Sequence, residues 1–282
     1  MNKAEISAAG FAAIRRSPRR LICNIQGMPK SGKTRLALTA KKPIGYIAVE
    51  IGGDEGVVDQ FIPVGADSFE DIQRTLIRIP AIEIPADIAD ADKYDKAVSA
   101  EVQRTAGIAL DAFYTAYYAS IQNFATTIVD TGSDLWEIAR LANFGRLEKV
   151  PQLAYTQLNK SMDKIIDDAF SAAGSVIFIH HMKELWSNVL GENGKMRGQA
   201  SGEFGMAGYG GMKKKVQATI ELWREDLTEP NENTGRLTRF HGQIIDSRHN
   251  ADSIGLRLAD DELTFSKIGA ALVTGSKQSD WE

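Results

Sequence analysis

The chain has 282 residues, of which 43% are hydrophobic and 25% are charged, with a formal net charge of −4. This composition is that of a folded domain with a full core, so it excludes a chain that is disordered over most of its length. The negative charge argues against a uniformly basic nucleic-acid coat, and without a run of about eighteen apolar residues or a secretory signal we expect a cytoplasmic protein that does not span a membrane.

Two predicted strands and a helix follow an expected N-terminal arm, residues 1–19. The apolar run "RLICNIQ", residues 20–26, reads as a strand, and "TRLALTA" after the next loop has helical periodicity. The segment "KPIGYIAVEIGG" predicts a second buried strand, residues 44–51, closed by paired glycines. This alternation is typical of an α/β domain, which we expect over residues 20–270, with residues 271–282 as a tail.

The segment of residues 63–122 differs in character from its surroundings. Prolines interrupt its first half, whereas its second half combines good helix formers with an apolar stripe, so we expect a helical insertion. After it, "FATTIVDTGS" predicts a third strand that ends at Asp130, and "SVIFIHH" predicts a fourth. Helices are expected between these two strands.

The last third of the chain has a different pattern. Residues 187–211 are rich in glycine and lack periodicity, so they predict a long loop or hairpin. The segments "VQATIELWRE" and "RLTRFHGQIIDSRHN" then predict consecutive strands. We therefore expect a mainly parallel central sheet with an antiparallel C-terminal extension.

The sequence "GMPKSGKT" fits the phosphate-binding pattern GxxxxGK[ST] without a mismatch, and it lies between a strand and a helix. In this pattern glycines let backbone N–H groups point at phosphate oxygens, the lysine reaches the β and γ phosphates, and the final hydroxyl binds Mg²⁺. We therefore expect ATP and Mg²⁺ as cofactors, bound by Gly27, Met28, Pro29, Lys30, Ser31, Gly32, Lys33 and Thr34.

Two acidic residues at strand ends are candidates for the rest of such a site. Asp130 ends the apolar run "TTIVD" and could hold the Mg²⁺ ion with Thr34, or it could cap the following helix, for which Ser133 is better placed. Glu50 ends "YIAVE" and could orient the attacking water, although it could also be an exposed strand end. Lys33 and Glu50 are thus the first catalytic candidates.

Together these residues resemble the RecA-like ATPases, and among them the phage-encoded nucleotide-binding proteins related to Sak-type single-strand annealing ATPases. The resemblance rests on "GMPKSGKT", on the short route from Lys33 to Glu50, and on "IVDTGSDLW". It implies a RecA-like P-loop NTPase core that hydrolyses ATP slowly by itself. It also implies a homo-oligomer, a ring or a filament, in which a neighbouring subunit completes each active site.

The resemblance also implies further catalytic residues. His180 or His181 in "IFIHH" occupies the position that senses the γ phosphate, and because adjacent strand residues face opposite ways only one can do so; we choose His180, with a structural histidine as the alternative. In "IIDSRHN", Arg248 matches the arginine of the K-x-R pattern that acts on a neighbour's site, whereas Asp246 replaces the lysine. A second source of such a cation is the run Lys213, Lys214 and Lys215.

The glycine-rich segment falls where the resembling proteins carry a DNA-contacting loop. Its basic and aromatic side chains could contact the phosphates and bases of single-stranded DNA, and the alternative is a plain surface hairpin. These DNA-binding candidates are Lys195, Arg197, Phe204, Tyr209, Lys213, Lys214 and Lys215.

The leading hypothesis is a phage-type ATPase that couples ATP hydrolysis to single-stranded DNA binding in recombination, annealing or replication, alongside a phage single-strand-binding or replication protein. The alternative is a nucleotide-gated assembly or regulatory protein that acts on a protein partner. A small-molecule kinase is the weakest reading, because the chain lacks an obvious arginine-rich lid.

Overall fold

The computed structural model describes residues 19–49, 57, 72–79, 96–146, 150–190, 196–230 and 235–282. Three sequence predictions lie outside these residues: most of the N-terminal arm, the base Glu50, and the DNA-binding candidate Lys195.

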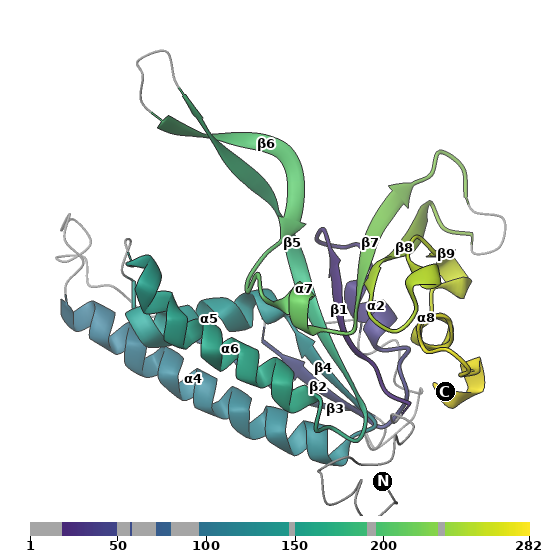
Figure 1. Cartoon of the computed structure of the whole chain (residues 1–282), viewed down its shortest axis with the longest axis horizontal. Coiled ribbons are helices and arrows are strands. Elements are labelled where there is room, and N and C mark those ends of the chain that lie inside the picture. The colour runs from purple at the N-terminus through teal and green to yellow at the C-terminus, as the bar shows by residue number, and fades with distance from the viewer. Residues whose placement is uncertain are drawn as a thin grey trace, which may run out of the picture.

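A nine-stranded sheet forms the body of the molecule, in the order β3-β2-β4-β5-β1-β7-β8-β9, with β6 paired to β5 (Figure 1). The strands from β3 to β7 in this order run parallel, whereas β8 and β9 are antiparallel to their neighbours. The strands are β1 (Ile22–Gly27), β2 (Ile44–Ala48), β3 (Ile72–Leu76), β4 (Thr126–Asp130), β5 (Ser175–Leu190), β6 (Met196–Met206), β7 (Ala218–Asp226), β8 (Thr238–Ser247) and β9 (Arg257–Ala259). The expected α/β fold, with a mainly parallel sheet and an antiparallel C-terminal extension, is confirmed.

Helices cover both faces of this sheet, as Figure 1 shows. The α-helices are α2 (Lys33–Ala37), α4 (Lys96–Asn123), α5 (Gly132–Phe144), α6 (Tyr155–Ala169), α7 (Met212–Lys215) and α8 (Phe265–Leu272). Short 3₁₀ turns complete them: η2 (Gln152–Ala154), η3 (Ala251–Ser253), η4 (Asp260–Glu262) and η5 (Gln278–Asp280). Strands β1, β2 and β4 are buried at every position, because helices cover both faces of the sheet, and this is why they could be recognised as mostly apolar runs.

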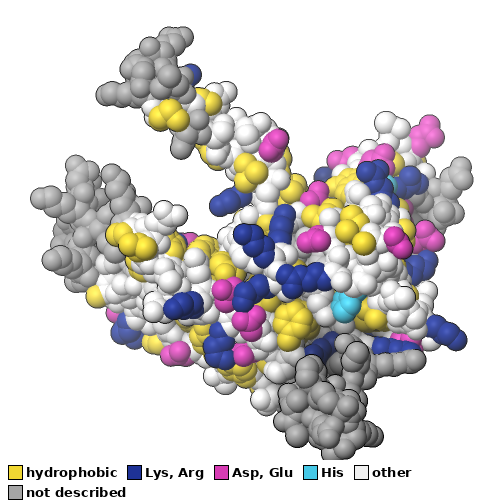
Figure 2. All heavy atoms as spheres, in the orientation of Figure 1, with side chains coloured by type: hydrophobic (Ala, Val, Ile, Leu, Met, Phe, Trp, Pro, Cys, Tyr) yellow, Lys and Arg dark blue, Asp and Glu magenta, His cyan; other side chains and the backbone are white. Residues whose placement is uncertain are grey.

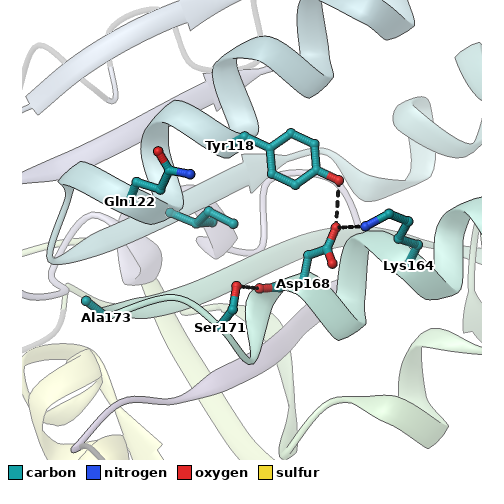
Figure 3. Close-up of a pocket in the computed structure, with 7 residues that line it drawn as sticks. Tyr118, Gln122, Lys164, Asp168, Ser171 and Ala173 are labelled. Carbon is teal, nitrogen blue, oxygen red and sulfur yellow. Dashed lines mark hydrogen bonds and ion pairs between the residues drawn. The ribbon is translucent and has the colours of Figure 1, made fainter.

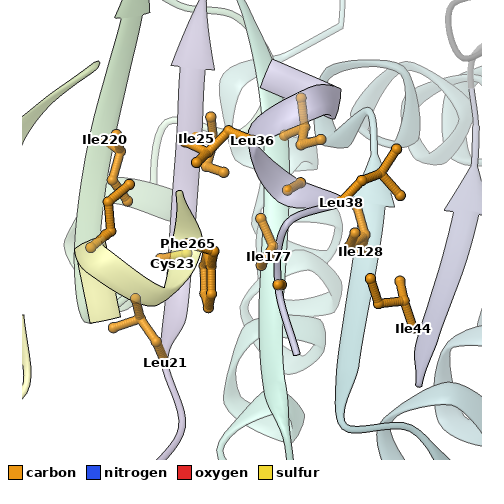
Figure 4. Close-up of a cluster of buried hydrophobic side chains, with 14 of the residues drawn as sticks. Leu21, Cys23, Ile25, Leu36, Leu38, Ile44, Ile128, Ile177, Ile220 and Phe265 are labelled. Carbon is orange, nitrogen blue, oxygen red and sulfur yellow. The ribbon is translucent and has the colours of Figure 1, made fainter. Parts of the chain in front are cut away.

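Alternate side chains of each central strand point to opposite faces of the sheet and pack in two separate hydrophobic cores. Ile25 and Ile177 point to the face covered by α2 and α8, where they meet Leu36 and Phe265 (Figure 4). Their strand neighbours, such as Phe178, pack instead against α4, α5 and α6. The two faces of the sheet are therefore chemically separate, and a residue's position along a strand decides which of them it serves.

The predicted helical insertion is an integral part of this fold. Its helical half is α4, and its side chains Phe113 and Tyr117 are fully buried against the sheet and α6. The Tyr117 hydroxyl donates a hydrogen bond of 2.7 Å to the Ile165 carbonyl oxygen. The segment also contains β3, which we did not predict and which extends the sheet beside β2. Because β3 is an edge strand with only Ile72 buried, it lacks the apolar run that identifies the central strands.

Most of the glycine-rich segment forms a hairpin, one of the two predicted alternatives, but the hairpin begins before residue 187 and ends at Met206. Strand β5 runs without a break from the central sheet to Leu190, and beyond residue 181 it pairs with β6 alone. Residues 182–190 and 196–206 thus form a two-stranded ribbon, the β5–β6 arm, which projects from the body (Figure 1). Over the ranges that the structure describes, none of the helices combines the length and apolar character needed to cross a membrane.

If α4 is integral, removing its buried contacts should destabilise the whole domain. We expect Phe113→Ala to lower the free energy of unfolding by about 3–5 kcal/mol, because it leaves a cavity between the helix and the sheet. The matched control on the same helix is Ile108→Ala, whose side chain is 58% exposed and whose loss should cost less than about 0.5 kcal/mol. Urea unfolding measures both, and equal small effects would show that α4 is an appendage.

Candidate functional site

The candidate site lies at the edge of the sheet where the parallel strands end. Strand β1 ends at Gly27 and strand β4 ends at Asp130, with β5 between them. Ligands of open α/β sheets bind outside this edge, because the loops that follow the strands converge there. The sheet order therefore places the predicted phosphate loop and the predicted metal-binding carboxylate on the same side of the molecule.

The phosphate loop has the strained backbone that its sequence requires. Lys30 and Gly32 adopt left-handed conformations, with φ of 63° and 89°. A Cβ on Gly27 would lie 2.5 Å from both the Leu222 carbonyl oxygen and Ser31 Oγ, so only glycine fits at the start of the loop. Ser31 Oγ is buried and has no hydrogen-bond partner among the described residues. A buried, unpartnered hydroxyl in such a loop is chemically suited to bind a phosphate oxygen.

Lys33 crosses the mouth of this loop. Its side chain is buried, and its Nζ donates hydrogen bonds to the carbonyl oxygens of Gly27, at 3.0 Å, and Met28, at 2.8 Å. Ionised phosphate oxygens are stronger acceptors for an ammonium group than peptide carbonyls. The lysine is therefore held at the place where a phosphate group would compete for it.

The predicted metal residues meet directly. Thr34 Oγ1 donates a hydrogen bond to Asp130 Oδ2 at 2.7 Å, although the two residues are 96 positions apart. The Tyr46 hydroxyl donates to the same oxygen at 2.7 Å and so orients the buried carboxylate. A hydroxyl and a carboxylate fit Mg²⁺, which prefers oxygen ligands and keeps several waters. Sequence reasoning missed Tyr46, whose only signal was its place two residues before the end of β2.

The helix-cap alternative for Asp130 is wrong, and so is the choice of Ser133 as the cap. Thr131 caps α5, because its side-chain oxygen accepts the N–H of Asp134 at 3.1 Å. Ser133 Oγ instead accepts the backbone N–H of His181 at 3.0 Å and donates to the Ala207 carbonyl oxygen. The Asp130 carboxylate therefore does not cap α5, and it binds the Thr34 hydroxyl after the phosphate loop instead.

The choice of His180 over His181 is also wrong. His180 is fully buried on the face covered by α5, and its Nδ1 lies 2.6 Å from Asn24 Oδ1. Burial, helped by repulsion from His181, lowers the pKa of His180 to about 3, so the ring is neutral at neutral pH. Alternation along β5 places His181 with Ile177 and Ile179, on the face of α2 and the phosphate loop. His181, and not His180, therefore lies on the same face as the phosphate loop.

Arg248 lies at the opposite edge of the sheet from this site. Strand β8 is antiparallel to β7, so it ends where the parallel strands begin, and the Arg248 N–H donates to the Gln217 carbonyl oxygen at 2.8 Å. Its side chain is exposed. Arg248 consequently contributes nothing to the site of its own chain.

The remaining DNA-binding candidates divide into exposed and structural residues. Arg197 is exposed on the arm, and Phe204 is 48% exposed there. Tyr209 is wrong as a base-stacking residue, because its ring is buried against Trp136 and its hydroxyl donates to Asp163 Oδ1 at 2.6 Å. The candidate that sequence reasoning missed is Trp186, whose side chain is 69% exposed on the arm.

The three consecutive lysines are not equivalent. Lys215 forms ion pairs with Asp167 at 2.8 Å and Asp163 at 3.4 Å, so it ties α7 to α6. Lys214 is exposed and Lys213 is half-buried. Figure 2 shows basic side chains at the foot of the arm, in the region where α7 lies. Of the run, only Lys214 is fully exposed.

A separate pocket of about 480 Å³ lies between α4 and α6 (Figure 3). Its polar groups bind one another: Asp168 Oδ2 accepts from the Tyr118 hydroxyl and from Lys164 Nζ, both at 2.6 Å. Ser171 and Ala173 line it just before β5 begins, which is the edge of the sheet opposite the phosphate loop. This pocket is therefore not part of the candidate site.

Comparison of the sequence with protein families and with curated proteins identifies no relative of this chain. No protein-family model matches the chain, and no curated protein matches it. Among solved structures, it is similar to a KaiC-like protein from the hyperthermophilic archaeon Pyrococcus horikoshii OT3, with a TM-score of 0.43 and 10% identity, covering 85% of this chain and 84% of that chain. The candidate site accordingly rests on the geometry of its own residues.

The fit of Gly27 against β7 can be tested by adding one methyl group. We expect Gly27→Ala to lower the free energy of unfolding by about 1–3 kcal/mol, because its Cβ would overlap the Leu222 carbonyl oxygen. Gly210→Ala is the matched control: no atom lies within 4 Å of its Cβ, so its effect should stay within about 0.5 kcal/mol. Thermal unfolding measures both, and a neutral Gly27→Ala would contradict the close packing.

Proposed function

We propose that this chain is a RecA-like P-loop ATPase of the phage-encoded kind, which binds ATP with Mg²⁺ and hydrolyses it. The observation that carries the proposal is the convergence of Lys33, Thr34 and Asp130 at the carboxyl ends of β1 and β4. The loop supplies N–H groups, a cation and a hydroxyl for a phosphate chain, and Asp130 supplies the carboxylate that a magnesium complex needs.

Each residue has a defined task in this proposal. The loop N–H groups bind the phosphate chain, and Lys33 exchanges the Gly27 and Met28 carbonyls for phosphate oxygens. Thr34 and Asp130 hold the Mg²⁺ ion, which supplies charge neutralisation at the phosphate oxygens when bound. Tyr46 keeps the Asp130 carboxylate oriented. Glu50, outside the described residues, is proposed as the base that orients the attacking water.

Two substitutions separate binding from turnover. We expect Lys33→Ala to weaken ATP binding and to lower hydrolysis about 100-fold or more, because it removes the cation that neutralises the phosphate chain. Glu50→Gln should keep ATP binding while hydrolysis falls by about 100-fold or more, because the amide cannot accept a proton. Phosphate release and calorimetric ATP titration measure the two properties.

The control for these variants is Lys160→Ala, which removes an exposed cation from α6 and should change neither property. Normal turnover in Glu50→Gln would reject the role of Glu50. Normal turnover in Lys33→Ala would reject the ATPase proposal itself.

Single-stranded DNA is the partner that we propose for the arm. Support comes from the exposed aromatic residues Trp186 and Phe204 and from the exposed Arg197, because bases stack on aromatic rings and phosphates bind arginine. Lys213 and Lys214 add positive charge on α7, between β6 and β7. In this proposal the ATPase acts in recombination, annealing or replication, alongside a phage single-strand-binding or replication protein.

One observation favours a protein partner instead. The described part of the arm carries as many acidic as basic side chains: Lys183 and Arg197 against Glu184 and Glu203. A neutral ribbon with exposed apolar side chains is as well suited to a protein surface as to a polyanion. The second candidate function is therefore a nucleotide-gated protein that acts on another protein.

We also propose that the protein acts as a homo-oligomer, a ring or a filament, in which a neighbour's cation completes each site. The exposed Arg248 at the far edge of the sheet is a candidate for that cation. The same arrangement predicts slow hydrolysis by a separated subunit.

Salt dependence distinguishes the two partners. If the arm binds single-stranded DNA, the affinity for an oligothymidine should fall steeply between about 50 and 200 mM salt. The affinity should also fall in the Trp186→Ala and Arg197→Gln variants, whereas Lys160→Gln on α6 should leave it unchanged. Fluorescence anisotropy measures the affinity. An absence of binding at low salt would favour the protein partner.

A further inference from the structure

We propose that Tyr46 determines the metal selectivity of the candidate site, because its hydroxyl engages one oxygen of Asp130 and so favours Mg²⁺ over a larger cation such as Ca²⁺. This inference rests on the proposed function and deepens it. That function assigns Thr34 and Asp130 to the metal, but it gives no reason why one divalent cation is preferred to another. Tyr46 acts through Asp130 and is therefore a positioning residue.

The register of two neighbouring strands lets Tyr46 reach Asp130. Strands β2 and β4 are parallel, and in their pairing Tyr46 lies opposite Ile128, whereas Ala48 lies opposite Asp130. Tyr46 is thus two residues before the level of Asp130, which is about 6.6 Å along a parallel strand. A tyrosine side chain can span that length. Tyr46 and Ile128 belong to the core on the α2 face, so the hydroxyl meets the carboxylate on the same face as Thr34.

One oxygen of the Asp130 carboxylate accepts two hydrogen bonds. The hydroxyl groups of Thr34 and Tyr46 both donate to Oδ2, each at 2.7 Å. A carboxylate oxygen has two lone pairs, and these two donors engage both of them. Tyr46 is only 1% exposed and Asp130 only 7% exposed, so bulk water does not compete freely for these bonds. Asp130 can therefore approach a cation through Oδ1 or through a water molecule, but not through both oxygens at once.

This restriction distinguishes between the two cations. Ca²⁺ takes about six to eight oxygen ligands and often binds both oxygens of a carboxylate, whereas Mg²⁺ takes six in a near-ideal octahedron and keeps several waters. The Thr34 hydroxyl donates its hydrogen to Asp130 and keeps its lone pairs for a metal. A hydroxyl, a carboxylate restricted to one oxygen, and waters are a ligand set that suits the smaller ion.

Removing the Tyr46 hydroxyl should loosen this restriction. In Tyr46→Phe the ring remains in the core, but Oδ2 keeps only the hydrogen bond from Thr34. The carboxylate can then turn and offer both oxygens to a cation, as Ca²⁺ prefers. Loss of a hydrogen-bonding partner of a metal-binding residue typically costs about 10–100-fold in metal affinity. We therefore expect weaker binding of the magnesium complex and a smaller preference for Mg²⁺.

Calorimetric titration with ATP tests the inference in three buffers, which contain saturating Mg²⁺, saturating Ca²⁺, or EDTA. The wild-type protein should bind ATP more tightly in Mg²⁺ than in Ca²⁺. Tyr46→Phe should lower the affinity in Mg²⁺ about tenfold, leave the affinity in Ca²⁺ the same or higher, and leave the affinity in EDTA unchanged.

The matched control is Tyr117→Phe. Its hydroxyl is also buried and donates a hydrogen bond of 2.7 Å, but to the Ile165 carbonyl oxygen on the opposite face of the sheet. This variant loses an equivalent buried hydrogen bond far from the phosphate loop. It should leave all three ATP affinities unchanged, so it separates the effect on the metal from a general loss of stability.

The outcomes separate this inference from the proposed function. If the wild-type protein binds ATP in none of the three buffers, the proposed function fails and this inference fails with it. If the wild-type protein binds ATP equally well in Mg²⁺ and Ca²⁺, or if Tyr46→Phe leaves the ratio of these affinities unchanged, only the role of Tyr46 is overturned. A loss in EDTA as large as the loss in Mg²⁺ would also overturn it, since the effect would then not depend on the metal.

Discussion

The hydrogen bond between the Thr34 hydroxyl and the Asp130 carboxylate connects the two halves of the candidate site, and the arrangement of the sheet makes it possible. The bond depends on β1 and β4 running in the same direction with only β5 between them. Tyr46, at the third position along β2, completes the contact. Three oxygen atoms thus meet at one point, from helix α2 and from strands β2 and β4.

The two faces of the sheet carry separate hydrophobic cores with different roles. On one face, α2 and α8 enclose the core that lies behind the phosphate loop. On the other, α4, α5 and α6 form a larger helical layer whose aromatic residues, such as Phe113 and Tyr117, stack on each other. His180 belongs to this second layer, where burial keeps its imidazole neutral, and it is separated from the phosphate loop by the thickness of the sheet. His180 and His181 are adjacent in the sequence, yet they lie on opposite faces of the sheet and have different environments.

The sequence was a good guide wherever a pattern had a single structural explanation. Continuous apolar runs revealed the buried strands, and the spacing of Gly27, Gly32, Lys33 and Thr34 predicted the loop. Asp130 was found because it ends such a run. The sequence was a poorer guide where the answer depended on the tertiary arrangement. Only the packing of α2 shows which face His181 shares with the loop, and only the antiparallel return of β8 shows that Arg248 is at the far edge.

Other residues could not have been assigned because their local sequence is ambiguous. Strand β3 is an edge strand with mostly exposed side chains, so its pattern resembles that of a loop. Tyr209 lies in glycine-rich surroundings like those of the arm, yet its ring packs against Trp136 in the body. Trp186 is a large apolar residue on the same strand as the buried run before the histidines, which suggests burial, whereas the structure exposes it. In each case long-range contacts outweigh local composition.

Strand β5 has a mechanical consequence because it belongs to both the site and the arm. Within the sheet it is clamped between β1 and β4, and from residue 182 it continues as one side of the ribbon. Its nine residues from 182 to 190 extend for about 30 Å, so a small tilt at the clamped end becomes a large displacement at the tip. The β5–β6 arm can bend at the register shift between Glu184 and Trp186, because the regular strand pairing is interrupted there. A force applied to the arm is therefore transmitted along β5, the strand that lies between the phosphate loop and Asp130.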